Sequence, residues 1–206
     1  MEIYINIDGV IRNTIQKFDH HYKDFFLSSE TENEESFEYG IEYPIHNDSI
    51  LDSYKFQSND EYLNFAFVDY SMEIFGHAGL SYMNAITELN NFIYENKEHN
   101  VTLIGLDHLG KSKPATLFFL SKNAYLGNII KFTSGDEIPN LWEKCDLWIT
   151  DNEKIIDMCP SNKKIIKFNT DYNKHFTNQY EIDKFSQINK LWLEDTEKNT
   201  TLILTQ

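Results

Sequence analysis

A regular alternation of short apolar runs with helix-like segments constrains the fold most. Four apolar runs recur in the second half of the chain, at residues 101–106, 128–132, 146–150 and 164–168. The segments between them have helical spacing, at 113–122, near 138–144 and near 152–158. Strands that alternate with helices pair in parallel and carry helices on both faces of the sheet. Together with an apolar strand at 2–7, the pattern predicts an α/β domain with a parallel, Rossmann-like sheet of about five strands flanked by helices.

The stretch between the first strand and the run at 101–106 is longer than an ordinary crossover connection. We therefore expect a core domain formed by residues 1–13 and 98–206, with residues 14–97 inserted as a mostly helical cap. Helical spacing within the insertion predicts helices near 15–25, 60–76 and 80–97. The acidic stretch at 28–40 is expected to be an exposed loop, and residues 43–58 are ambiguous.

Charge and composition exclude several classes of protein. The formal net charge of −15 argues against broad binding to nucleic acid or to an anionic membrane. It leaves room for a small phosphorylated ligand, which needs only a local positive site. The two cysteines, Cys145 and Cys159, form no CxxC pair, and no targeting segment is apparent, so we expect a reduced, cytoplasmic setting. No apolar run approaches the roughly 20 residues that span a bilayer.

Polar side chains stand at the ends of the predicted strands. Asn6 and Asp8 end the first strand, Asp151 follows the run at 146–150, and a loop with two lysines follows the run at 101–106. Ligands of open parallel sheets bind beyond the carboxyl ends of the strands. Two carboxylates that converge there suit Mg²⁺, and a nearby lysine suits a phosphoryl group.

These motifs resemble those of the haloacid dehalogenase (HAD) superfamily. "INIDGVIRNT" resembles its first motif, an apolar strand followed by Asp-x-Asp-Gly, and "CDLWITDNEKIID" resembles its fourth motif. The segments "KKIIKFNTDYN" and "YSMEIFGHAGLSYMNAITELN" are similar to parts of 5′-nucleotidase-like members. The resemblance implies a HAD-like fold, and the position of the insertion corresponds to the cap that this superfamily calls C1.

The resemblance also implies roles for three residues at the strand ends. Asn6 stands where the superfamily keeps its nucleophilic aspartate, Asp8 stands at the general acid/base, and Asp151 stands at the metal-binding acid. A Mg²⁺ cofactor would then be held by Asn6, Asp8 and Asp151. The chemistry of the superfamily is phosphoryl transfer to the first aspartate, followed by hydrolysis of the aspartyl phosphate.

Phosphate binding is expected at the loops that follow the first two core strands. The candidates are Gly9, Asp107, Lys111 and Lys113, and either lysine could fill the third motif's role. The chain departs from the superfamily where a serine or threonine of the second motif is expected, because Leu106 and Asp107 stand there instead. Lys131 and Lys144 are further candidates for the third-motif lysine.

The amide at position 6 divides the functional hypotheses. An amide is a far weaker nucleophile than a carboxylate. The first hypothesis is a Mg²⁺-dependent phosphomonoesterase or nucleotidase that Asn6, as an introduced Asp→Asn change, leaves inactive or substrate-trapping. The second is a natural pseudophosphatase that binds a small phosphorylated ligand, such as a nucleotide, or a protein partner. The third is a flavodoxin-like or other open α/β domain without this chemistry.

Two motifs also have purely structural interpretations. Asp8-Gly9 is a common turn pair, and either Asp151 or Asn152 could serve only as the N-cap of the following helix.

Overall fold

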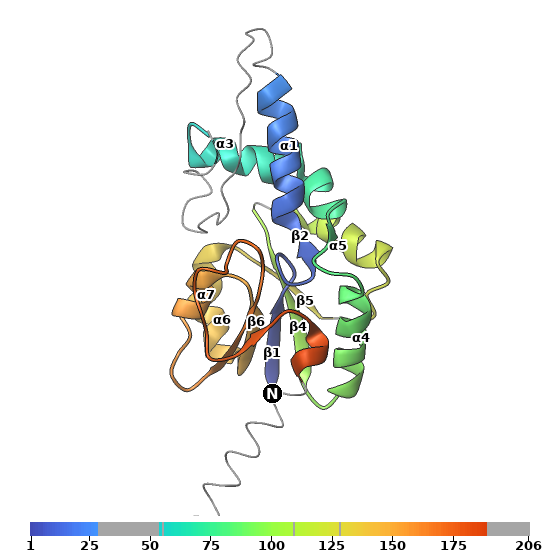
Figure 1. The fold of residues 1–206 in the computed structure, drawn as a ribbon, viewed down its shortest axis with the longest axis vertical. Helices are drawn as coiled ribbons and strands as arrows, with labels where there is room; N and C mark the ends of the chain where they lie inside the picture. Colours follow the sequence, from blue (N-terminus) through green and yellow to red (C-terminus); the bar gives the residue numbers. More distant parts are fainter. Residues whose placement is uncertain (29–53, 55, 109, 128, 189–206) are drawn as a thin grey trace, which may run out of the picture.

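Six parallel strands form the central sheet, in the order β5-β4-β1-β6-β7-β8 (Figure 1). The computed structural model describes residues 1–28, 54, 56–108, 110–127 and 129–188. The strands are β1 (Glu2–Asn6), β4 (Asn100–Leu106), β5 (Ile130–Thr133), β6 (Leu147–Thr150), β7 (Lys164–Phe168) and β8 (Glu181–Ile182). The predicted parallel sheet is confirmed. The sequence did not predict β8, a two-residue strand that extends the sheet beside β7.

The central position of β1 determines where the polar strand ends lie. Ile5 is paired with Leu103 of β4 on one side and with Ile149 of β6 on the other. Because the three strands are parallel and in this register, Asn6, Thr150 and Leu106 all lie near the same edge of the sheet. The residues that follow them are therefore gathered at that edge.

Helices cover both faces of the sheet, as the alternation predicted. One face is covered by α4 (Ala85–Glu95), α5 (Lys113–Lys122) and η4 (Phe185–Gln187), and the other by α6 (Ile138–Lys144) and α7 (Glu153–Asp157). Ile3, Ile5 and Ile7 belong to the first core, whereas Tyr4 belongs to the second core with Trp148. The period of two in β1 thus places Asn6 on the Tyr4 side of the sheet.

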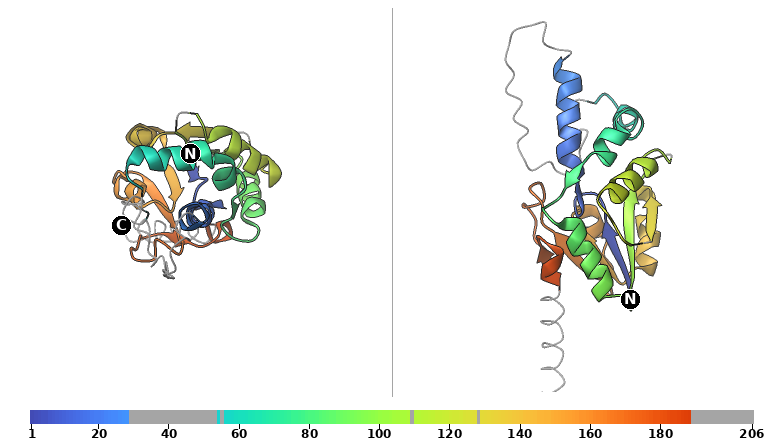
Figure 2. Two further views of the ribbon diagram at one scale, coloured as in Figure 1. Left: turned by 90° about the horizontal axis from the view of Figure 1, so that it is seen from above. Right: turned by 90° about the vertical axis from the view of Figure 1, so that its right-hand side faces the viewer.

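A separate aromatic cluster lies beyond the carboxyl end of β1. It is built from α1 (Thr14–Ser28), α3 (Asn59–Leu63) and two π-helical segments, η1 (Asn64–Asp69) and η2 (Met72–Gly76). Figures 1 and 2 show α1 rising at the end of the molecule opposite the N-terminus. The buried aromatic cluster contains Phe18, Tyr22, Tyr54, Phe56, Phe65, Phe67, Phe75 and Tyr172. Phe25, which continues the apolar spacing of α1, is 48% exposed.

A two-residue antiparallel pair joins the start and the end of this segment. β2 (Arg12–Asn13) pairs with β3 (Gly79–Leu80), so the chain leaves the sheet region at Asn13 and returns beside it at Gly79. The expected limits of the inserted cap, 14–97, stay a prediction. The acidic stretch from residue 29 and most of 43–58 lie outside the described residues.

Helix α4, which falls within the expected insertion, packs on the sheet. Its Ile86, Leu89 and Phe92 belong to the same core as Ile5. The helix begins five residues later than the periodicity indicated, because Asn84 takes a left-handed conformation with φ 73° at its start. No helix in the described ranges has the length and apolar character needed to cross a membrane.

Leu89→Ala tests whether α4 folds with the sheet. Leu89 is fully buried, so we expect a loss of about 3 kcal/mol in the free energy of unfolding, measured by chemical denaturation. Tyr94→Ala on the same helix is the control, since Tyr94 is 78% exposed and its loss should change stability by no more than about 0.5 kcal/mol. Two unfolding transitions, with only one of them affected by Leu89→Ala, would contradict a shared core.

Candidate functional site

Asn6 ends β1 with its side chain engaged by a tryptophan. The Trp148 indole Nε1 donates a hydrogen bond of 2.8 Å to Asn6 Oδ1, and both side chains are buried. A buried indole N–H needs an acceptor, and the amide oxygen supplies it. Asn6 therefore caps the aromatic core beneath it, where Trp148 packs against Tyr4 and Trp142.

Asp8 lies in the turn that follows β1 and is paired with a buried arginine. Arg12 Nε donates to Asp8 Oδ1 at 2.7 Å, and the Thr14 hydroxyl donates to the same oxygen. The Arg12 side chain is 0% exposed and that of Asp8 is 17% exposed. The turn interpretation of Asp8-Gly9 is also correct, because Gly9 has φ 76° and its N–H donates to the Arg12 carbonyl.

Asp151 follows β6 and is buried against the turn after β1. The Tyr172 hydroxyl donates to Asp151 Oδ2, and the Asn173 side-chain amide donates to the Asp151 carbonyl at 3.0 Å. The pKa of Asp151 is raised to about 7, mainly by burial and to a lesser extent by the nearby charge of Asp8. The hydrogen bond from Tyr172 acts in the opposite direction. Asn152, and not Asp151, is the N-cap of α7, because its side chain accepts from the Ile155 N–H.

Gly9 makes the close approach of Asp151 geometrically feasible. A Cβ at position 9 would lie 1.9 Å from Asp151 Oδ2 and 2.5 Å from the Tyr172 hydroxyl oxygen. The positive φ of Gly9 favours glycine as well. The glycine predicted to bind phosphate thus lies directly against the predicted metal-binding acid.

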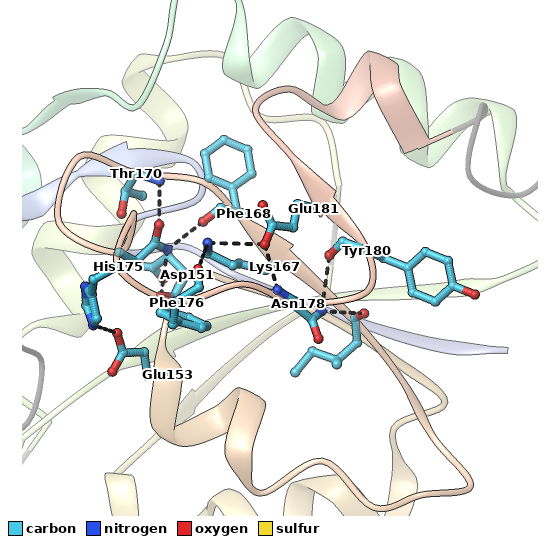
Figure 3. Close-up of polar contacts among 12 residues, drawn as sticks. Asp151, Glu153, Lys167, Phe168, Thr170, His175, Phe176, Asn178, Tyr180 and Glu181 are labelled. Carbon is cyan, nitrogen blue, oxygen red and sulfur yellow. Dashed lines mark hydrogen bonds and ion pairs between the residues drawn. The ribbon is translucent and has the colours of Figure 1, made fainter.

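A loop at residues 169–180, which we call the edge loop, makes polar contacts with the segments around it (Figure 3). Asn173 anchors its first half by donating to the Phe168 carbonyl as well as to that of Asp151. Lys167, buried in β7, donates to the Phe176 carbonyl, and His175 pairs with Glu153. These contacts join the edge loop to β7, to Asp151 after β6 and to the start of α7, so the loop that carries Tyr172 is fixed relative to the sheet.

A cleft of about 810 Å³ opens beside this arrangement. Its lining includes Gly9, Asn13 and Gln16, together with Thr170 and Tyr172 of the edge loop. Among the described residues that line it, Lys174 is the basic one, and it is paired with Asp171 at 2.6 Å. The volume lies within the range of about 300–1,000 Å³ that is typical of small-molecule sites.

The loop between β4 and α5 contains the remaining predicted phosphate ligands. Asp107 accepts hydrogen bonds from the Gly110 N–H, the Ser112 N–H and the Ser112 hydroxyl, so it holds its own loop. Lys111 and Lys113 are exposed, and the Lys113 ammonium lies 5.6 Å from the centre of the Phe132 ring. None of these three predicted ligands is among the described residues that line the cleft. Their phosphate-binding role stays a prediction.

The residues that were expected to hold Mg²⁺ do not fit the ion in this arrangement. One oxygen of each of Asn6, Asp8 and Asp151 already accepts a hydrogen bond from another side chain. Asp151 Oδ2 also faces the Gly9 backbone at close range, whereas Mg²⁺ needs a near-octahedral shell that includes several waters. Within the described residues, no group of three or more His, Cys, Asp or Glu side chains could hold a metal ion. At this site, Asp8 Oδ2 and Arg12 Nη2 are both buried without a hydrogen-bond partner among the described residues.

Sequence reasoning missed three residues of this site: Arg12, Trp148 and Tyr172. Arg12 is four residues after Asp8 but gave no sign of burial, since arginines are mostly exposed. Trp148 lies within the apolar run at 146–150, where nothing in the sequence distinguishes it from the other core residues. Tyr172 lies in "KKIIKFNTDYN", a segment that was noted only for its resemblance to nucleotidase-like proteins.

No known family model and no curated protein matches this sequence. Among solved structures, the chain is similar to one described as a HAD hydrolase, family IA, variant 3, from Entamoeba histolytica HM-1:IMSS. The TM-score is 0.58 at 12% sequence identity, and the match covers 91% of this chain and 95% of that chain. The likeness concerns the fold, and it confirms the prediction of a HAD-like α/β fold.

Gly9→Ala tests the contact between the two strand ends. We expect Gly110→Ala, which has the same φ of 76° but open space around its Cβ, to cost about 1 kcal/mol. Gly9→Ala should cost about 2 kcal/mol more, because the added carbon overlaps Asp151 and Tyr172. Chemical denaturation of both variants measures the difference. Equal losses would mean that Asp151 does not lie against Gly9.

The burial of Asp151 predicts a pH dependence of stability. The pKa of Asp151 is about 7 in the folded chain and 3.8 for the unperturbed group. The folded chain therefore binds the extra proton between these values, and its stability falls as pH rises from about 4 to about 7. This fall is measured as a decrease in melting temperature with rising pH, in the presence of EDTA. The decrease should be smaller for Asp151→Asn, which retains an acceptor for the Tyr172 hydroxyl but cannot titrate. Identical pH profiles for the two proteins would contradict the shift.

Proposed function

We propose that this chain is a pseudophosphatase, a protein with the HAD-like fold that binds a small phosphorylated ligand and does not transfer its phosphoryl group. The observation that carries the proposal is Asn6, whose amide oxygen is bound by Trp148 within a buried site. An amide in this position lacks the carboxylate that would form a covalent phosphoryl intermediate. The hydrogen bond to Trp148 gives the amide a structural role in its place.

The cleft beside the strand ends supports ligand binding, and of the strand-end residues it is lined by Gly9 and not by Asn6, Asp8 or Asp151. Its lining combines amides and hydroxyls of Asn13, Gln16 and Thr170 with the ring of Tyr172, and its volume suits a nucleotide-sized molecule. Such groups position a ligand through hydrogen bonds and stacking, without any chemical step. The cytoplasmic setting expected from the cysteines fits a nucleotide ligand.

A second candidate function is a nucleotidase-like, Mg²⁺-dependent phosphohydrolase with a C1-type cap, in which Asn6 replaces a nucleophilic aspartate. One observation favours it. Asp8 Oδ2 is buried without a partner among the described residues, and the charge of Asp8 influences Asp151. Two neighbouring acids at the end of adjacent strands are what such an enzyme would retain after losing only its nucleophile.

Asn6→Asp distinguishes the two candidates. If the chain is a pseudophosphatase, the Asn6→Asp variant should hydrolyse p-nitrophenyl phosphate and nucleoside monophosphates only at background level, with or without Mg²⁺. The new carboxylate would accept the Trp148 N–H, and position 6 is not among the described residues that line the cleft. Asn6→Ala is the matched control for background activity. A Mg²⁺-dependent gain of about 100-fold or more, as proper placement of a nucleophile provides, would establish the phosphohydrolase instead.

Ligand binding is measured on the unchanged chain by thermal shift. A ligand that binds only the folded state raises the melting temperature as its concentration rises. Nucleoside monophosphates should do so, and Gln16→Ala at the cleft should reduce the shift while Lys122→Ala, outside the cleft lining, should not. If no phosphorylated compound raises the melting temperature, binding of a small phosphorylated ligand is contradicted. The hypothesis of a pseudophosphatase that binds a protein partner then remains.

A further inference from the structure

The buried guanidinium of Arg12 contacts the site in a way that the HAD resemblance does not explain. Its Nε donates to Asp8 Oδ1 at 2.7 Å and its Nη1 donates to the Phe75 carbonyl at 2.9 Å. The guanidinium carbon lies 5.0 Å from the centre of the Phe75 ring and 5.6 Å from that of Phe119. A charge buried among aromatic rings is stable only when an opposite charge accompanies it, so Arg12 depends on Asp8.

Asp8 depends on Arg12 in the same way. Its side chain is 17% exposed, and Arg12 is its partner in an ion pair. The charge of Asp8 is therefore balanced by Arg12, while its second oxygen, Oδ2, is buried without a hydrogen-bond partner among the described residues. Thr14 donates to the oxygen that Arg12 contacts, which further favours this orientation of the carboxylate.

The other two expected metal ligands are also satisfied from within the chain. Trp148 donates to Asn6 Oδ1, and Tyr172 donates to Asp151 Oδ2. One oxygen of each expected ligand thus accepts from the chain itself: Asp8 from Arg12 and Thr14, Asn6 from Trp148, and Asp151 from Tyr172. The Gly9 backbone also lies close to Asp151 Oδ2, on a side where Mg²⁺ would need its waters.

We propose that Arg12 is an internal cation that takes the place of a divalent metal ion, so that the folded site needs no metal. The guanidinium balances Asp8 from the core side, and Trp148 and Tyr172 satisfy the neighbouring oxygens. The proposal concerns the site of the proposed function, yet it makes a claim about cation binding and not about activity.

The first test is cation binding by the unchanged, EDTA-treated chain. Free Mn²⁺, followed by electron paramagnetic resonance, should show no binding to the site, and about 10 mM MgCl₂ should not change the melting temperature relative to NaCl of equal ionic strength. A site filled to about 100 times its Kd would raise the melting temperature by roughly 5–10 °C. Such a rise, lost in Asp151→Asn, would overturn the proposal.

The second test replaces the internal cation. Arg12→Met retains the length of the side chain and leaves Asp8 without its counter-charge, so the variant should melt lower and should now be stabilised by Mg²⁺. Arg12→Lys, which retains the charge, is the matched control and should remain insensitive to Mg²⁺. A folded Arg12→Met that is equally insensitive would overturn the role of Arg12.

Two further variants keep the proposal testable if Arg12→Met does not fold. The double variant Asp8→Asn/Arg12→Met removes both charges, so it should fold and its melting temperature should not rise with Mg²⁺. Tyr172→Phe removes the hydrogen bond to Asp151 Oδ2 but retains Arg12, so its melting temperature should not rise with Mg²⁺ either. A Mg²⁺ response in either variant contradicts the proposal. A failure of the proposed function would be seen in other experiments. These are the hydrolysis assay of Asn6→Asp and the change in melting temperature with phosphorylated ligands, and neither measures Mn²⁺ binding.

Discussion

The ion pair between Asp8 and Arg12 is the interaction on which the site depends. It joins the turn after β1 to two other parts of the fold, since Arg12 also donates to the Phe75 carbonyl of η2 and lies against Phe119 of α5. A buried arginine that lost its carboxylate would be strongly destabilising, because the remaining charge would have no counter-charge and no water. The end of the central strand, the base of the aromatic segment and one covering helix are therefore held together by one charged contact.

Tyr172 makes a second connection between the same parts. Its ring belongs to the aromatic cluster with Phe18 and Phe75, and its hydroxyl binds Asp151 at the sheet edge. The edge loop that carries it is tied to β6 and β7 by Asn173 and Lys167. Any movement of the aromatic segment relative to the sheet would thus disturb both carboxylates at once, which couples the geometry of the site to the packing above it.

The sequence predicted the parallel sheet because its strands are apolar runs of four or more residues with helical spacing between them. It could not predict β8, since two residues have no period, nor the start of α4, which depends on the left-handed Asn84. Position within the sheet explains why Asn6, Asp8 and Asp151 lie near one edge, and that much follows from the strand ends alone. Their partners do not follow from the sequence, because burial of Arg12 and the aim of the Trp148 and Tyr172 side chains arise only when distant segments pack.

The amide at position 6 and the arginine at position 12 are two parts of one charge balance. An aspartate at position 6 would stand two residues before Asp8, which lies in the turn after β1, and close to the end of β6, where Asp151 is buried. Three neighbouring carboxylates repel one another strongly in a site shielded from water, and a metal ion is the usual remedy. With Asn6, only two acids remain. Arg12 neutralises Asp8, and the raised pKa of Asp151, caused mainly by burial, lets that acid hold a proton near pH 7. An amide that also accepts the Trp148 N–H thus removes the charge that would otherwise make a cation necessary.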